Sequence, residues 1–102
     1  MLYTISTSPY YNDFNSLINL ISKNDEILLL QDGVLMGHKI LSSNKDNKYL
    51  MQLKNKMINV LALKDDIDAR GLMPYISSYV NKISYINFVE LTVKHSQYFS
   101  WQ

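Results

Sequence analysis

The chain has 102 residues, which is enough for one compact domain, 1–102, and too little for two. Its apolar share of 47% and charged share of 19% are typical of a packed globular domain and argue against a disordered segment. A formal net charge of +1 provides no overall field to hold a nucleic acid or an anionic membrane, so any basic patch must be local.

The chain contains no cysteine. This excludes disulfides, thiolate metal sites, iron–sulfur clusters and cysteine nucleophiles, and it is compatible with a reducing compartment. No apolar run approaches the ~18 residues of a membrane span, and the first residues lack the basic segment of a signal peptide. The sequence therefore predicts a cytoplasmic protein.

The hydrophobic pattern predicts strands that alternate with helices. Residues 2–6 alternate as in a strand, and the nearly continuous apolar run at 26–31 is typical of a parallel strand covered on both faces. Between these strands a helix is expected at about 12–22, with Asn12 as its N-cap. Apolar residues at helical spacing form its inner face: Phe14, Leu17, Ile18 and Ile21.

The central part continues this alternation. Residues 37–48 are polar and are expected to form an exposed loop. A helix at about 48–56 precedes a third strand at 57–63. The side chains expected to point inward from this helix are Tyr49, Leu50 and Leu53.

The following segment predicts a short helical turn and a fourth strand. Asp65 or Asp66 is expected to cap the turn, which stops at Gly71 because glycine suits the position after a helix end. The fourth strand is expected within 76–84. Strands alternating with helices predict an α/β sandwich around a parallel sheet with right-handed crossovers.

The last predicted helix begins at Ser84, its N-cap, and Glu90 is expected to pair with Lys94 four positions later. An aromatic tail at 98–102 follows this helix. The residues expected to share the helix's inner face are Tyr85, Phe88, Val89, Thr92 and Val93.

Ligands of an open α/β sheet lie at the carboxyl ends of its strands, and three segments reach that edge. The hydroxyl-rich loop 6–10 could hold a phosphate, but it lacks glycine and Pro9 removes a donor, which favours capping. Asp32 could bind magnesium, but no second acid follows the first strand, which favours a turn. Asp65 and Asp66 could act as acid and base, but adjacent residues point differently, which favours helix capping.

The remaining polar residues give little indication of catalysis or of ligand binding. His38 and His95 lack partners at metal-ligand spacing and are expected at the surface or in an interface. Lysines that could contact a phosphate backbone occur at 45, 48, 54 and 56, although a solvated loop explains them as well. We therefore expect no catalytic residue, no metal site and no cofactor.

Aromatic side chains are abundant, with eight tyrosines in a small domain. Aromatic residues concentrate at interfaces, where the ring is buried against apolar atoms and the polar group of a tyrosine or tryptophan side chain forms a hydrogen bond. Two interpretations stay open: these side chains bind a partner, or they cover the edge of the chain's own sheet. The residues concerned are Tyr75, Tyr79, Tyr98, Phe99 and Trp101.

Several segments together resemble the TusB/DsrH family, in the family's order and at nearly its spacing. The segments are Met1-Leu2-Tyr3-Thr4, Ser8-Pro9, Leu28-Leu29-Leu30-Gln31-Asp32-Gly33-Val34, Ala62-Leu63, Asp66, Ala69-Arg70-Gly71-Leu72, Phe88-Val89, Leu91-Thr92-Val93-Lys94-His95 and Trp101. Two departures lie in predicted loops. The loop at about 35–47 is longer than in the family, and Ser96 follows His95 where the family commonly has proline.

The resemblance implies a fold and a role. The family has a flavodoxin-like three-layer sandwich around a mainly parallel sheet. Its tRNA branch supplies one subunit of TusBCD, a cytoplasmic heterohexamer with two copies of each of three related chains. That complex relays persulfide sulfur from TusA to TusE, toward 2-thiolation of the wobble uridine of tRNA. The resemblance therefore implies TusC-like and TusD-like partners, with the transferring cysteine in the TusD-like chain.

Without cysteine the chain cannot carry a persulfide, so we expect a non-catalytic subunit with a structural or recognition role. DsrH relatives in sulfur oxidation commonly carry a cysteine, so its absence favours the tRNA branch. We expect the partner interface to include Arg70, Tyr98, Phe99 and Trp101. The alternatives are a small flavin or phosphate-ligand module using loop 6–10 and a weak RNA-binding protein using the lysines. The leading interpretation predicts no direct contact with nucleic acid or membrane.

Overall fold

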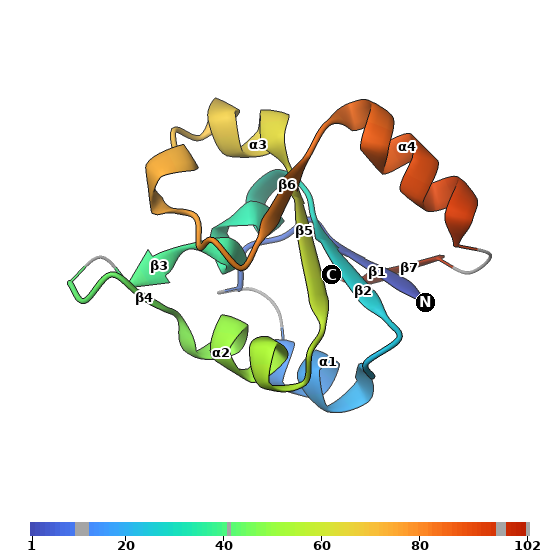
Figure 1. The fold of residues 1–102 in the computed structure, drawn as a ribbon, viewed down its shortest axis with the longest axis horizontal. Helices are drawn as coiled ribbons and strands as arrows, with labels where there is room; N and C mark the ends of the chain where they lie inside the picture. Colours follow the sequence, from blue (N-terminus) through green and yellow to red (C-terminus); the bar gives the residue numbers. More distant parts are fainter. Residues whose placement is uncertain (10–12, 41, 96–97, 102) are drawn as a thin grey trace.

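The computed structural model describes residues 1–9, 13–40, 42–95 and 98–101, the last range for its backbone only. A five-stranded parallel sheet forms the centre, in the order β6-β5-β2-β1-β7 (Figure 1). Its strands are β1 (Leu2–Ile5), β2 (Glu26–Leu29), β5 (Asn59–Leu63), β6 (Asn81–Ile83) and β7 (Tyr98–Trp101). The four strands expected from the sequence are confirmed, and the tail adds a fifth that was not expected.

Helices cover the sheet on both sides, with α1 and α2 across the sheet from α4 (Figure 1). The helices are α1 (Phe14–Leu20), α2 (Lys48–Asn55), α3 (Lys64–Ala69) and α4 (Tyr85–Lys94), with short 3-10 helices η2 (Gln31–Gly37) and η3 (Met73–Tyr75). This arrangement confirms the three-layer α/β sandwich with a parallel sheet. In the described part of the chain, no helix reaches the length and hydrophobicity needed to cross a bilayer.

The larger core lies between the sheet and the layer of α1 and α2. The expected inner face of α1 is confirmed, because Phe14, Leu17, Ile18 and Ile21 are all buried. Leu50 and Leu53 of α2 are fully buried, and Tyr49 packs partly against the same core. These positions could be predicted because each helix has a single apolar stripe.

The capping residues differ from two expectations. Asp13, not Asn12, is the N-cap of α1, because the Asp13 carboxylate accepts hydrogen bonds from the backbone N–H and hydroxyl of Ser16, at 3.2 and 2.6 Å. Neither Asp65 nor Asp66 caps α3, since Leu63 occupies the N-cap position and both acids lie in the first turn. There they still complement the helix dipole.

The segment 37–48 contains more regular structure than the expected loop. Lys39–Ile40 (β3) and Lys45–Asp46 (β4) form a short antiparallel pair. Asn47 is the N-cap of α2, because its Oδ1 atom accepts from the N–H groups of Tyr49 and Leu50. Its side-chain amide also donates to the carbonyls of Met36 and His38, at 2.8 and 2.7 Å. The alternation within two-residue strands is too short to be read from a sequence.

The inner face of helix α4 matches the expected one only in part: Phe88 is confirmed as facing the core, but Tyr85, Val89 and Val93 are exposed. Ser84 is confirmed as its N-cap, accepting from the N–H of Asn87 at 3.2 Å. However, Phe88 and Leu91 are the residues that contact the second core, formed by the buried side chains of Leu2, Leu28 and Leu61. Four apolar residues of α4 are exposed instead: Tyr85, Ile86, Val89 and Val93.

The expected pairing within α4 is also wrong. Lys94 Nζ lies 3.8 Å from Glu26 Oε1, and the described residues show no ion pair between Lys94 and Glu90. The physical reason is that the C-terminal end of α4 reaches the start of β2, where a partly buried carboxylate attracts the ammonium group more strongly than an exposed one.

Candidate functional site

Two segments that carry the family resemblance meet at the carboxyl ends of β2 and β5. Arg70, just after α3, places Nη2 2.9 Å and Nε 3.0 Å from the Oδ1 atom of Asp32, at the start of η2. Its Nη1 donates to the backbone carbonyl of Asp66 at 3.1 Å and lies 3.8 Å from Asp66 Oδ1. All three guanidinium nitrogens therefore hold η2 and α3 together.

Asp66 extends this network to the backbone of the other segment. Its Oδ2 atom accepts a hydrogen bond from the N–H of Gln31 at 2.8 Å. Gln31 has a φ of 50°, in the left-handed region that residues other than glycine rarely adopt. The carboxylate of Asp66 thus stabilises an unusual turn at the end of β2, and we call Asp32, Asp66, Arg70 and Gln31 the Arg70 network.

Gly33 is the point where η2 passes closest to the sheet. A Cβ atom at Gly33 would lie 2.0 Å from the backbone oxygen of Ile5, far inside van der Waals contact. No side chain fits there unless the backbone moves. The close approach fixes η2, and with it Asp32, against β1.

These contacts bear on the magnesium site considered at Asp32 and on the acid–base pair considered at Asp65 and Asp66. Asp32 is paired with Arg70, and Asp65 is exposed while Asp66 is partly buried and engaged elsewhere, so the two adjacent acids form no acid–base pair. The described residues contain no cluster of three or more side chains that could hold a metal ion. Within the described residues, the contacts of the Arg70 network link η2 to α3.

A second polar cluster lies at the opposite edge of the sheet. Glu26, the first residue of β2, has Oε1 2.6 Å from His95 Nε2 and accepts a hydrogen bond from the Asn59 amide at 2.6 Å. Burial would raise the pKa of the Glu26 carboxyl, but the contacts with His95, Asn59 and Lys94 outweigh burial and lower it. His95 is thus a partly buried partner of Glu26 and not a freely exposed surface residue, while its expected alternative place in an interface stays a prediction.

The loop 6–10 is described only as far as residue 9. Ser8 is buried and Pro9 is half-buried, and Tyr10 lies outside the described residues. Pro9 contributes to the wall of a cavity described below. His38, the other histidine, is half-buried and has Nδ1 2.7 Å from the carbonyl oxygen of Lys39.

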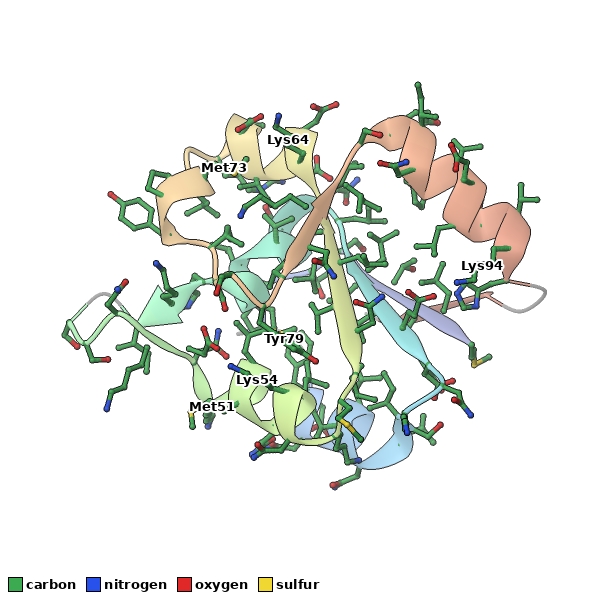
Figure 2. All side chains as sticks on the ribbon, in the orientation of Figure 1. Met51, Lys54, Lys64, Met73, Tyr79 and Lys94 are labelled. Carbon is green, nitrogen blue, oxygen red and sulfur yellow. The ribbon has the colours of Figure 1, made fainter. Side chains whose placement is uncertain are left out.

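The lysines at 45, 48, 54 and 56, considered above as a contact for a phosphate backbone, differ in their surroundings. Lys56 donates to the carbonyls of Ile18 and Ile21 at the end of α1. Lys48 and Lys54 each lie over a tyrosine ring, at 5.1 Å from the Tyr49 centroid and 5.9 Å from the Tyr79 centroid, and Figure 2 shows Lys54 near Tyr79. Lys45 is exposed in β4. Such dispersed contacts are typical of structural lysines more than of an RNA-binding patch.

The expected aromatic residues occupy three different settings. Tyr79 is half-buried and donates its hydroxyl proton to the carbonyl of Ile58, whereas Tyr75 is 44% exposed in η3. The tail residues form β7, whose backbone pairs in parallel with β1 from Leu2–Tyr98 to Ile5–Trp101. The side chains of β7, including Phe99, lie outside the described part of the structure.

The sequence reasoning missed an apolar surface on α4, which we call the outer face of α4. It consists of Tyr85, Ile86, Val89 and Val93, which are 61%, 70%, 43% and 81% exposed. Residues 85, 89 and 93 follow at four-residue intervals and therefore form one ridge along the helix. The signal was present in the sequence, since α4 has apolar residues on two opposite sides and the sheet can bury only one.

Comparisons with known proteins agree with this architecture. A family model described as "DsrH like protein" matches residues 7–98. Proteins named "Protein TusB" from Shigella dysenteriae serotype 1, Photorhabdus laumondii and Escherichia coli are each 46% identical to this chain over 101 residues. Each alignment covers 99% of this chain and 100% of the relative.

Two solved structures share the fold. The crystal structure of the YchN protein from E. coli has a TM-score of 0.72 at 18% identity, covering 98% of this chain and 97% of that one. The solution structure of Tm0979 from Thermotoga maritima has a TM-score of 0.61 at 23% identity, covering 95% and 97%. With the fold, the family model and full-length relatives in agreement, the chain belongs to the TusB/DsrH family.

Proposed function

We propose that the chain is a non-catalytic subunit of a cytoplasmic TusBCD-type heterohexamer, which passes persulfide sulfur toward 2-thiolation of the wobble uridine of tRNA. The observation that carries this proposal is membership of the TusB/DsrH family in a chain with no cysteine. Its direct partners are a TusC-like and a TusD-like subunit, and the complex exchanges sulfur with TusA and TusE.

The chemistry of the relay supports the non-catalytic role. A thiolate attacks the outer sulfur of a donor persulfide, forms a new S–S bond, and releases the donor as its thiolate. Hydroxyl and imidazole groups cannot carry that sulfur as a persulfide. The accepting cysteine therefore belongs to another subunit, which we propose is the TusD-like one, and this chain contributes structure and recognition.

The outer face of α4 supports a subunit role. A helix with apolar residues on both sides is normally buried on both sides, and here the sheet covers only the side of Phe88 and Leu91. Exposed apolar ridges of this kind mark protein–protein contacts. We propose that a related α/β subunit of the same complex covers Tyr85, Ile86 and Val93.

The interface residues expected from the sequence remain part of this proposal. Arg70 lies at the carboxyl edge of the sheet and is 29% exposed, while its partner Asp32 is 64% exposed, so the ion pair is accessible to a neighbour. Strand β7 is the terminal strand of the sheet formed by the described residues, and an edge strand presents backbone groups that can pair with another chain. We propose that Tyr98, Phe99 and Trp101 contribute to the partner interface from this edge.

Co-expression tests the proposed assembly. A tagged copy of this chain, expressed with the TusC-like and TusD-like chains of the same genome, should purify with both, and native mass measurement should give two copies of each. Incubation with a persulfide donor should leave the intact mass of this chain unchanged and add sulfur to the TusD-like chain. Purification of this chain without either partner, or a stable sulfur adduct on it, would contradict the proposal.

A further inference from the structure

A cavity of about 400 Å³ lies beside the first turn of α2. Its apolar walls include Pro9 after β1, Leu35 in η2 and Ile40 in β3, and the Tyr49 ring faces the same space from α2. Cavities of roughly 300–1,000 Å³ with mostly apolar walls are typical of small-molecule sites. The cavity also lies next to the loop after β1 and the segment after β2, where α/β folds bind ligands.

The Tyr49 ring is held in place as one wall of this cavity. Its centroid lies 5.3 Å from that of the buried Phe14 ring, with an interplanar angle of 40°. The Lys48 ammonium lies 5.1 Å from the same Tyr49 centroid. An aromatic wall that is already ordered costs a ligand little conformational entropy on binding.

The polar side chains in the cavity lining include two nitrogen bases, Lys48 and His38, and the neutral amide of Asn47, which donates to the carbonyls of Met36 and His38. Lys48 is exposed and makes no ion pair in the described part of the chain. The carbonyl of Lys39 can only accept, so His38 Nδ1 is its donor, and His38 Nε2 has no hydrogen-bond partner among the described residues. The described lining contains no carboxylate, and nearby Asp46 accepts from the Ser77 hydroxyl at 2.5 Å.

The same contacts disfavour a phosphate. A phosphate at the start of a helix needs free backbone N–H groups, but Asn47 Oδ1 already accepts from the N–H groups of Tyr49 and Leu50, at 3.0 and 3.1 Å. No arginine fork lines the described cavity. One ammonium group and one imidazole suit a single negative charge.

We propose that this cavity binds a small organic carboxylate with a flat, apolar body. The carboxylate pairs with Lys48 at the rim, the flat body stacks on Tyr49, and Leu35 and Ile40 close the apolar walls. His38 Nε2 contributes a further polar contact. The site is independent of the proposed sulfur-relay role, because none of these residues belongs to the Arg70 network or to the outer face of α4.

The test uses 2-naphthoate as probe and neutral 2-naphthamide as its matched control, titrated into the full isotope-labelled chain by NMR. At about 1 mM, 2-naphthoate should shift the backbone amides around 35–40 and 47–49 and not those of α4. Lys48→Met should weaken naphthoate binding about tenfold and leave naphthamide binding unchanged, because it removes the charge and keeps the apolar stem. Lys48→Arg should restore part of the naphthoate affinity.

Lys54→Met is the matched control variant, since Lys54 also lies on α2 over a tyrosine ring but outside this cavity. It should leave naphthoate binding unchanged. Thermal melting of all three variants shows that they are folded. The proposal is overturned if naphthoate shifts only α4 or nothing at about 1 mM, if naphthamide binds equally well, or if Lys54→Met weakens binding as much as Lys48→Met.

Discussion

Arg70 and Asp32, 38 residues apart in the sequence, form an ion pair in which Nη2 lies 2.9 Å from Asp32 Oδ1 and Nε donates a hydrogen bond to the same oxygen at 3.0 Å. This contact ties the segment after β2 to the end of α3, at the carboxyl edge of the sheet. Arg70 is the only arginine in a chain with nine lysines, and its planar fork is suited to contact Asp32 and the Asp66 carbonyl at once.

Replacing Arg70 by lysine should remove this fork while keeping the charge. Because Asp32 is largely exposed, we expect the free energy of unfolding to fall by only about 0.5–1 kcal/mol, measured by urea denaturation. If Arg70 also faces a partner, Arg70→Lys should weaken assembly of the co-expressed complex. Lys82→Arg, at an exposed position of β6, serves as a control that should change neither property. Unchanged stability and unchanged assembly in Arg70→Lys would exclude both roles.

Gly33 provides a sharper test of the fold at this edge. Gly33→Ala places a Cβ 2.0 Å from the Ile5 backbone oxygen and should destabilise the chain by about 2 kcal/mol or more, because backbone must move. Gly71→Ala is the matched control, since its Cβ meets open space and only its φ of 64° opposes alanine, at a cost of about 1 kcal/mol. Equal melting temperatures for the two variants would contradict the close approach of η2 to β1.

The cluster in which the Glu26 carboxylate contacts His95, Asn59 and Lys94, which we call the Glu26 cluster, predicts that the stability of the fold is sensitive to acid. The pKa of Glu26 is lower in the folded chain than its ordinary value of 4.5, because contacts with His95, Asn59 and Lys94 outweigh burial. A depressed carboxyl pKa stabilises the fold above the unfolded pKa, and this stabilisation is lost as the pH falls through the folded pKa. The Glu26→Gln variant should therefore be less stable than the parent chain near neutral pH. When the pH falls below 4.5, the free energy of unfolding of this variant should decrease less than that of the parent chain.

The control for this pH profile is Glu90→Gln, since Glu90 is exposed on α4 and has no ion pair among the described residues. Urea denaturation across the acid range gives the two profiles. If Glu26→Gln and the parent chain lost stability in parallel over that range, the Glu26 cluster would not be the source of the acid sensitivity.

If the outer face of α4 is an interface, substitutions on it should disrupt assembly of the complex without changing the stability of the free chain. Val93 and Ile86 are 81% and 70% exposed, so Val93→Glu and Ile86→Glu should leave the melting temperature of the free chain nearly unchanged. Both should disrupt assembly, because each places a charge in the proposed apolar interface. Asn87→Glu adds the same charge elsewhere on α4 and should assemble normally. Normal assembly of the Val93 and Ile86 variants on size-exclusion chromatography would exclude this face as an interface.

The aromatic tail predicts an anchoring role for Trp101. The backbone of β7 pairs with β1, and exposed large aromatic side chains favour contact with an apolar surface that buries them. Trp101→Ala at a buried interface should cost about 2 kcal/mol or more. Loss of assembly with an unchanged melt of the free chain indicates contact with another subunit, and a lowered melt indicates packing on the chain's own sheet. No change in either measurement would show that the proposal is wrong.

The elements that the sequence predicted correctly are those with one apolar stripe or run. Phe14, Leu17 and Ile21 define α1 in this way, and the run before Asp32 defines β2. The packed side of α4 could not be predicted, because a helix with two apolar sides gives no local signal for the side that meets the sheet. The choice depends on where Leu2, Leu28 and Leu61 lie after the sheet has formed.

The residues of the candidate site could be predicted from the sequence, but the contacts between them could not. Asp32, Asp66 and Arg70 all belong to segments that resembled the family, but their mutual contacts depend on β2 and β5 being neighbours in the sheet. The strand order could not be derived from hydrophobic periodicity. The tail at 98–101 was likewise not predicted as a strand, since its pairing partner β1 lies at the other end of the chain.

We propose that this chain, although it has no cysteine, is required for sulfur transfer to tRNA. The most direct test measures the 2-thiouridine content of tRNA from a strain that lacks the gene for this chain. We predict that the modification is lost, and that expression of the intact chain restores it without this chain ever acquiring sulfur. Unchanged 2-thiouridine in the deletion strain would contradict the account.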